Sequence, residues 1–283
     1  LVGSEMCIRD RHMSDQNIND TAYGVTKAVL ESEAVSNLTN PPTKVAGGLL
    51  ADFINLTAGG IHYVSMKAEL KRQKKFEAFK SNIEKGVENI PPENQVEPRE
   101  SIIGPAVEKA KHYMNEDEIR EMFEKLIINS FDNRKIEKIH PSFSDIIQQM
   151  SPIDAQNLKC FANEERLPVC EIQLNLTDTS HRTLLTNVFC GNKLCNSIEQ
   201  QSISLSSLSR IGIIKIAYDE YLTDDSFYKI FDSLPLVIGL KNQVEADNKI
   251  NNTNFKIDLQ KGVATLTPVG KAFIDVCLRP LPT

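Results

Sequence analysis

The sequence predicts a mainly α-helical protein that ends in a small α+β part of winged-helix type. Up to about residue 165, apolar residues recur every three or four positions, which is typical of amphipathic helices. After Pro168 they alternate with polar residues, as in a half-buried strand. The C-terminal order, with this strand included, is expected to be helix, strand, helix, hairpin, helix. We therefore divide the chain into residues 1–12, 13–44, 45–165 and 166–283.

The first two parts lie outside the expected globular fold. Residues 6–11 read MCIRDR, which we interpret as the translation of a sequencing adapter. Residues 1–12 are then an artefact that fold analysis should leave out, and Met13 is the expected start. Residues 13–44 are expected to form an N-terminal tail with one short helix at 21–36.

Composition and charge narrow the class of protein. Hydrophobic residues make up 41% and charged residues 25% of the chain, which is ordinary for a globular protein. The net charge of −6 gives no general attraction to nucleic acid or anionic lipid. We find neither a secretion signal nor an uncharged apolar stretch of about 18 residues, so a cytoplasmic protein is expected. Besides Cys7 there are five irregularly spaced cysteines, which predicts reduced thiols.

The helical region begins with a proline-free stretch at residues 44–89, which predicts one long helix or two helices broken at Gly59-Gly60. Pro91-Pro92 ends this stretch because the residue before a proline avoids the helical conformation. Residues 91–98 are expected to be extended. Gly104-Pro105 predicts a further break.

Three more helices are expected before residue 165. The clearest amphipathic pattern, at 119–127, is preceded by a capping box made by Asn115 and Glu118. Its apolar side chains, including Met122, Phe123 and Leu126, are predicted to lie in the core. Ser142 is expected to cap the following helix. Ser151-Pro152 then combines a favourable cap with a proline in the first turn.

The C-terminal part starts with a strand at residues 170–176, in which Cys170 shares the apolar face and is expected in the core. A short helix at 202–210 should end at Gly212. Residues 255–267 are expected to form a hairpin, the wing, with its turn at 260–262. The segment 219–254 is long and polar, and we interpret it as an insertion.

The last expected helix begins at Pro268. Its apolar face should carry Val269, Ala272, Phe273 and Cys277, so that Cys277 also lies in the core.

Several short strings in this chain resemble, in their order and spacing, the Abi-alpha (abortive infection alpha) family. The similarity spans residues 45–278. It includes the strings IPPE at 90–93, HPSF at 140–143, LSRIGII at 208–214 and LTPVGKAF at 266–273. The resemblance implies defence against phage by abortive infection, in which an infected cell stops growing or dies. It implies no catalytic residues. The candidate family-motif positions are Pro91, Pro92, Glu93, His140, Pro141, Phe143, Gly212 and Gly270.

The candidate chemical sites have simpler structural explanations. His140 stands beside proline and serine at a helix start, where packing or capping is the favoured role over catalysis. Cys190 and Cys195, with His181 upstream, have a spacing at the edge of the range for zinc sites, and no second cysteine pair follows. We therefore predict no catalytic residue, metal or cofactor, and a protein that is not an enzyme.

Residues 67–85 form a candidate basic patch. Seven basic residues stand against three glutamates there, for a net charge of +4. A solvated helix face is the favoured interpretation, and a binding surface for acidic partners is the alternative. The residues of the patch that we single out are Lys67, Lys71, Arg72, Lys74 and Lys75.

Two types of partner can be weighed from the sequence. Residues 215–260 contain five lysines and eight acidic residues, a net of −3, whereas DNA affinity depends on positive charge at phosphate contacts. Sequence-specific nucleic acid is therefore disfavoured, and a protein partner from phage or host is expected. A winged-helix transcriptional regulator and a hydrolase built on His140 are the alternatives. The oligomeric state is open.

A membrane surface is a further alternative. Residues 45–64 are mostly apolar or small, and the basic helix follows them directly, a combination that can lie on an anionic membrane. A buried helix is favoured because Asp52 and Asn55 are unfavourable in lipid.

Overall fold

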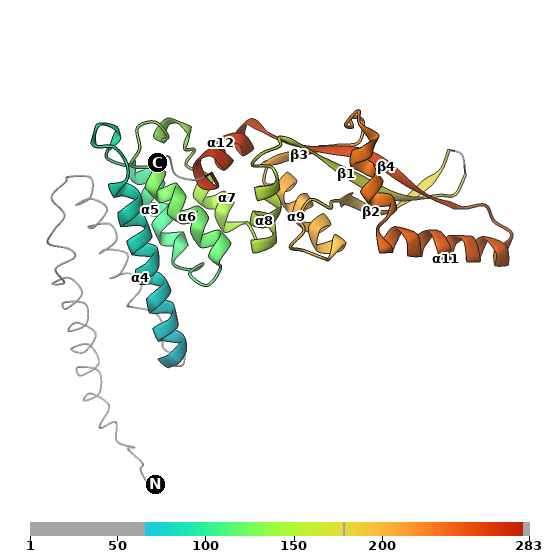
Figure 1. Ribbon diagram of the computed structural model, residues 1–283, viewed down its shortest axis with the longest axis horizontal. Helices are drawn as coiled ribbons and strands as arrows, with labels where there is room; N and C mark the ends of the chain where they lie inside the picture. The colour runs from blue at the N-terminus through green and yellow to red at the C-terminus, as the bar shows by residue number, and fades with distance from the viewer. Residues whose placement is uncertain (1–65, 178, 280–283) are drawn as a thin grey trace, which may run out of the picture. The chain divides into compact units, whose positions relative to one another are not determined.

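A computed structural model describes residues 66–177 and 179–279 of the chain, with side chains from Lys71 onward (Figure 1). The chain divides into two compact units, residues 1–74 and 75–283. The expectations for 1–12, for 13–44 and for the apolar segment 45–64 lie outside the described residues. The second unit, which begins at Lys75, contains the sheet and most of the described helices. Among the residues described, no helix is long and apolar enough to cross a membrane.

The first half of the described chain is helical, as expected. Between residues 66 and 160 the strand-type pairing of the described residues is limited to one bridge between Gln95 and Asp132. The elements are α4 (Met66–Glu88), η1 (Pro92–Asn94), α5 (Glu100–Ala110), α6 (Asp117–Asn129), η2 (Ile136–Lys138), α7 (Phe143–Gln148) and α8 (Pro152–Cys160).

Helix α6 is the centre of this helical region. Its predicted apolar face is confirmed, because Met122, Phe123 and Leu126 are each at most 1% exposed. Helices α5, α7 and α8 all contact α6, and so does the last helix of the chain, α12 (Pro268–Cys277). The expected capping box at its start is wrong. The N-cap residue is Glu116, and Glu118 does not cap the helix but accepts a hydrogen bond from Gln156 of α8.

Two expected breaks in the helical region are corrected. Gly104 and Pro105 lie inside α5, because the buried face that includes Ile103 and Val107 keeps the helix against its neighbours despite the backbone hydrogen bond that proline cannot make. Residues 91–98 are only partly extended, since η1 interrupts them. Gln95 then turns back and donates from Nε2 to the carbonyl oxygen of Ile90, at 2.9 Å, near the end of α4.

One of the two expected serine caps is confirmed. The Ser151 hydroxyl accepts from the Asp154 N–H and the Asp154 carboxylate accepts from the Ser151 N–H, which makes a capping box at the start of α8. The Ser142 cap is wrong. Its hydroxyl makes no capping bond and instead lies 2.7 Å from Nδ1 of His140.

The second half is built on a four-stranded antiparallel sheet in the order β2-β1-β4-β3. The predicted strand at 170–176 corresponds to β1, which begins earlier and ends at Asn175. Cys170 is 1% exposed and Cys277 is fully buried, so both predictions for these thiols are confirmed. The strands are β1 (Arg166–Asn175), β2 (His181–Val188), β3 (Ile214–Ala217) and β4 (Lys256–Leu266).

The predicted wing is wrong. Gln260, Lys261 and Gly262 do not turn but continue β4, paired with residues 169–171 of β1. Gly262 serves close packing here, since a Cβ atom would lie 2.6 Å from Cδ1 of Tyr218 and 2.7 Å from the Ala217 carbonyl oxygen. The winged-helix type is therefore not confirmed, and the fold is a mixture of many helices with a substantial sheet instead of an all-α protein.

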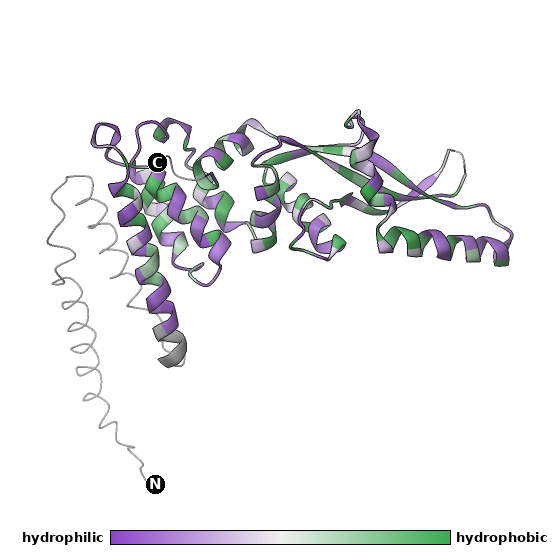
Figure 2. Cartoon of the chain, viewed as in Figure 1, coloured by the Kyte–Doolittle hydropathy of each residue, from purple (hydrophilic) through white to green (hydrophobic). Residues whose placement is uncertain are grey.

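Helices cover this sheet and connect it to the first half. The expected helix at 202–210 begins already at Ile198, and it ends before Gly212, whose φ of 78° suits glycine. The supposed polar insertion holds ordered helices, and Figure 2 shows the start of α11 as apolar and its remainder as mostly polar. The elements are α9 (Ile198–Arg210), η3 (Asp225–Tyr228), α10 (Lys229–Asp232), α11 (Pro235–Asn251) and α12 (Pro268–Cys277).

Candidate functional site

Two of the family-motif glycines meet in a tight joint at the start of α12. The Thr267 hydroxyl donates to the carbonyl oxygen of Gly212 at 2.6 Å, and the Thr267 N–H donates to that of Ile213 at 3.0 Å. A Cβ atom on Gly270 would lie 2.1 Å from the Ile213 carbonyl oxygen. Gly212 supplies the positive φ of the turn, and Gly270 supplies the space for the turn to pack on α12.

The motif around His140 leads to the same helix. Phe143 is buried and its ring lies edge to face with that of Phe273 in α12, with the centroids 5.2 Å apart. His140 and Pro141 are exposed. Nδ1 of His140 accepts from the Ser142 N–H at 3.2 Å, an arrangement that closes the start of α7. This geometry is that of a helix-start residue.

The motif residues Pro91, Pro92 and Glu93 lie elsewhere, in the loop between α4 and α5. That loop is held against the turn after α6, where the Asn133 N–H donates to the Asn94 carbonyl oxygen at 2.9 Å. The structure thus places the family-motif positions in this loop, at the start of α7 and in the joint at α12. Phe143 and Gly270 are closely packed. The exposed motif positions are Pro92, Glu93, His140 and Pro141.

The candidate basic patch lies on the first part of α4. The side chain of Lys67 is outside the described ones, and Lys71 and Lys74 are exposed. Lys75 forms an ion pair with Asp117 of α6, with 3.0 Å between Nζ and Oδ1. A binding role for this patch stays a prediction.

The two cysteines weighed as zinc ligands, Cys190 and Cys195, lie in the loop between β2 and α9 and are half-buried. Burial raises the pKa of the Cys190 thiol to about 11. In the described part of the chain no three His, Cys, Asp or Glu side chains come close enough to hold a metal ion.

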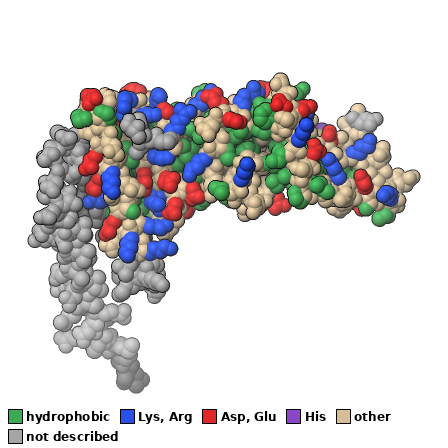
Figure 3. Space-filling view, in the orientation of Figure 1, with side chains coloured by type: hydrophobic (Ala, Val, Ile, Leu, Met, Phe, Trp, Pro, Cys, Tyr) green, Lys and Arg blue, Asp and Glu red, His purple; other side chains and the backbone are tan. Residues whose placement is uncertain are grey.

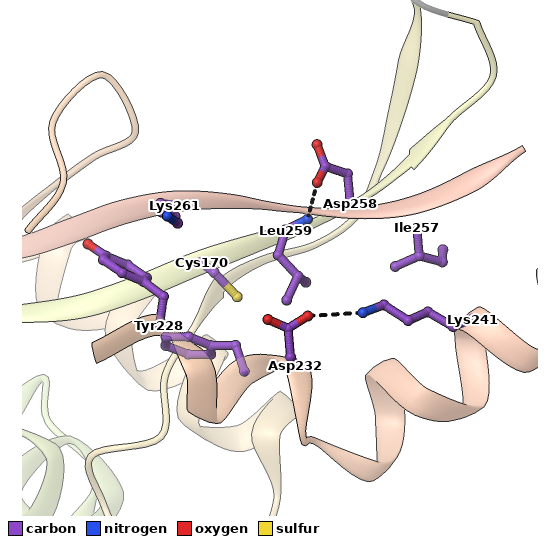
Figure 4. A pocket seen from close by; sticks show the side chains of 9 residues that line it. Cys170, Tyr228, Asp232, Lys241, Ile257, Asp258, Leu259 and Lys261 are labelled. Atoms are coloured by element: carbon purple, nitrogen blue, oxygen red, sulfur yellow. Dashed lines mark hydrogen bonds and ion pairs between the residues drawn. The ribbon is translucent and has the colours of Figure 1, made fainter. Parts of the chain in front are cut away.

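A cavity of about 170 Å³ lies between the sheet and the helices of the inserted segment, residues 219–254. None of the family-motif positions lines it. Its floor comes from Cys170 of β1 and from Ile257 and Leu259 of β4, which alternate on one face of the sheet. Phe231 of α10 and Tyr228 before it form the opposite wall. Figure 4 shows Cys170 and Leu259 pointing into the space between them and the helices.

Charged groups surround this apolar floor. Asp232 at the end of α10 pairs with Lys241 of α11 at 2.9 Å, and Figure 4 shows the pair beside the cavity. Lys261 pairs with Asp225 at 2.7 Å, and this hydrogen bond raises the pKa of the Lys261 amine. Asp258 also lines the cavity, but its carboxylate points away and accepts from the Leu259 N–H.

The walls are fixed by a buried hydroxyl. The Tyr228 hydroxyl donates to the Gly262 carbonyl oxygen at 2.9 Å and accepts from the Leu222 N–H at 2.9 Å. Nζ of Lys261 lies 5.5 Å from the centroid of the Tyr228 ring, within the range of a cation–π contact. The inserted segment is therefore tied to β4 at the edge of the cavity.

The cavity is better suited to binding than to catalysis. Burial raises the pKa of Cys170 well above that of an ordinary thiol, so this group is a neutral thiol and a poor nucleophile at neutral pH. Sequence reasoning missed the site because its walls come from three separate stretches of chain. The available signal was the alternation of Ile257 and Leu259 with polar residues, which we assigned to the wing.

The inserted segment also exposes large apolar side chains to solvent. On the face shown in Figure 3, hydrophobic side chains gather over the sheet and its covering helices among charges of both signs. Five exposed residues within 18 positions define what we call the apolar surface. They are Tyr221 (56% exposed), Phe227 (46%), Ile230 (49%), Leu236 (36%) and Ile238 (47%).

Comparison with known proteins adds the family. The family model described as abortive infection alpha matches residues 71–277, most of the chain and nearly all of its described part. Neither the curated proteins nor the solved structures gave a match. The resemblance noted in the sequence is thereby confirmed. The chain belongs to the abortive infection alpha (Abi-alpha) family, and this membership implies a role in abortive-infection defence against phage.

Proposed function

We propose that this chain acts in phage defence by binding another protein through its inserted segment, and that it performs no catalysis itself. The observation that carries the proposal is the apolar surface of the segment. Large apolar side chains that gather at the surface commonly mark interaction sites, and these five come from one short stretch of chain. Phe227 and Ile230, each close to half exposed, stand at its centre in the sequence.

The polar environment of the cavity supports binding over catalysis. Asp232 and Lys241 pair with each other, and Lys261 pairs with Asp225. The Asp258 carboxylate points away from the cavity, and burial holds the Cys170 thiol neutral. General acid–base or nucleophilic chemistry needs a group poised to gain or lose a proton near the working pH. The alternative of a hydrolase built on His140 also lacks support. Nδ1 of that imidazole already accepts a hydrogen bond from the Ser142 N–H, which is a structural contact at the start of a helix.

The alternative of a DNA-binding regulator loses support from the composition of α9, the expected recognition helix. One face of α9 is buried through Ser202, Leu205 and Leu208. The one basic residue of this helix, Arg210, donates to Gln149 at 3.1 Å. A recognition helix must present several polar or basic side chains to base edges and phosphates.

A phage challenge tests the proposal. Cells that carry the gene are compared with cells that carry a Phe227→Ser, Ile230→Ser double variant, and plaques are counted. We expect the double variant to lose protection while the purified protein keeps its melting temperature. Exposed apolar residues outside the inserted segment provide the matched control, Leu194→Ser with Ile203→Ser, since these side chains are 82% and 68% exposed.

The control variant should protect as well as the wild type. Full protection by the Phe227→Ser, Ile230→Ser variant would show that the apolar surface is not the site of action. Equal loss in both variants would show that any loss of exposed apolar area abolishes protection, and the proposal would fall.

A further inference from the structure

We propose that the cavity between the sheet and helices α10 and α11 receives one large apolar side chain from a basic polypeptide segment. This inference rests on the proposed function and specifies its partner. The inserted side chain would be the anchor of the contact, and the apolar surface around it would be covered by the rest of the partner.

The size and lining of the cavity fit one side chain. A volume of about 170 Å³ is close to that of an engineered protein cavity of about 150 Å³ that binds benzene. The space therefore accommodates an aromatic ring or a branched aliphatic group. Phe231, Leu259 and Ile257 offer apolar contact to such a group, and Ile257 and Leu259 are only half-buried by the chain itself.

The surroundings favour a polypeptide over a free small molecule. A benzene-sized ligand would cover the cavity and leave Phe227, Ile230 and Ile238 in water. Protein interfaces commonly combine a central pocket that is filled by one anchor with a surrounding ring of weaker contacts that excludes water. Here the lining residues Tyr228 and Phe231 directly follow the exposed Phe227 and Ile230 in the chain, as such an arrangement requires.

The charge of the inserted segment indicates the sign of the partner. Residues 219–254 contain seven carboxylates and three lysines, a net of −4, and all seven carboxylates are exposed. The cavity lining itself is balanced, with Asp232 and Asp258 against Lys241 and Lys261, so the negative charge comes from the exposed segment around it. The Asp232 side chain is 64% exposed even though it pairs with Lys241. Complementary charge steers association and disfavours wrong partners, so the anchor is expected to have lysine or arginine neighbours.

Peptide titration of the full chain tests this inference. The probes are blocked pentapeptides with the sequences Lys-Lys-Phe-Lys-Lys, Lys-Lys-Ala-Lys-Lys and Glu-Glu-Phe-Glu-Glu, and toluene as a free apolar ligand. Binding is followed by NMR through the methyl groups of Ile257 and Leu259. We expect the first peptide to shift these signals and to bind at least tenfold more tightly than either of the other two peptides.

Two variants locate the binding. Ile257→Phe adds a ring at the cavity. This variant should bind the Phe-containing basic peptide at least tenfold more weakly than the wild type does. Ile250→Phe adds the same ring at an exposed position of α11 that does not line the cavity, and should leave affinity unchanged. Melting temperatures of both variants are measured to confirm that they fold.

Three results would overturn the inference: equal affinity for the Phe and Ala peptides, equal affinity for the basic and acidic peptides, or toluene shifts without any shift from the basic Phe peptide. The phage challenge separates this failure from failure of the proposed function. If Ile257→Phe protects fully while Phe227→Ser with Ile230→Ser does not, the surface acts without the cavity.

Discussion

Phe143 at the start of α7 and Phe273 in α12 pack edge to face, with their ring planes at 73° and their centroids 5.2 Å apart. They lie at most 1% exposed and come from motif strings that are far apart in the sequence, at 140–143 and 266–273. Figure 1 shows α12 returning from the sheet to the helices of the first half. In that helix Asp275 also forms ion pairs with Lys135 and Lys138. Helix α12 therefore joins the sheet to the helical region.

The aromatic pair should contribute strongly to stability. We expect Phe143→Ala to lower the free energy of unfolding by about 3–5 kcal/mol, because it removes a buried ring and leaves a cavity. Chemical denaturation measures the loss. Phe227→Ala is the control, since that ring is 46% exposed and its removal should change stability by about 0.5 kcal/mol or less. Equal effects of the two substitutions would contradict the packing described for α7 and α12.

The joint at Gly270 should tolerate no Cβ atom. We expect Gly270→Ala to destabilise the protein by about 1–3 kcal/mol, because the added methyl group would overlap the Ile213 carbonyl oxygen. Gly104→Ala is the matched helical control. No atom lies within 4 Å of a Cβ placed there, so alanine should stabilise α5 by about 0.5–1 kcal/mol. Thermal unfolding of both variants measures these changes. A Gly270→Ala protein that is more stable than the wild type would contradict the close packing described at Gly270.

Glu124 should make stability depend on pH. Burial raises the pKa of its carboxyl above the ordinary 4.5, and the hydrogen bond from Asn82 and the attraction of Arg120 offset this only in part. Since the folded pKa is the higher one, the folded state binds the proton more tightly. The contribution of the protonated Glu124 to the free energy of unfolding is therefore fully present below pH 4.5. This contribution is lost as the pH rises through the pKa of the folded state.

The variant Glu124→Gln isolates this group. Because glutamine imitates the neutral acid, the variant should be more stable than the wild type at neutral pH and equally stable below pH 4.5. Denaturant unfolding at the two pH values measures the difference. A Glu124→Gln protein that is less stable at neutral pH would mean that the ionised carboxylate and Arg120 stabilise the fold together.

Nucleic acid should not bind tightly. We expect no shifted band when the full chain at nanomolar concentration is mixed with double-stranded DNA at physiological salt. The negative net charge of the chain, and the single basic residue of α9, leave few groups to contact phosphates. Binding under these conditions, with a steep salt dependence, would restore the regulator hypothesis.

Local periodicity predicted much of the helical region and part of the sheet correctly. The stripe in α6, the Ser151 cap, the buried Cys170 and the start of α12 at Pro268 all follow from residues within one or two turns or a few strand positions. The positions at which helices were expected to break were predicted less well. Pro105 stays inside α5 because burial of one helix face outweighs a single lost hydrogen bond, which no local rule contains.

The sequence by itself determined the family, the helical first half and the burial of Cys170 and Cys277, because motif order and the spacing of apolar residues are local properties of the chain. Only the tertiary structure decided that β4 runs straight through Gly262, since β1 pairs with it along its whole length. The existence of the cavity was likewise decided only by the tertiary structure. Cys170, Asp232 and Leu259 become neighbours through strand register and the docking of α10 and α11, and contacts between such distant residues leave no pattern at any fixed spacing in the sequence.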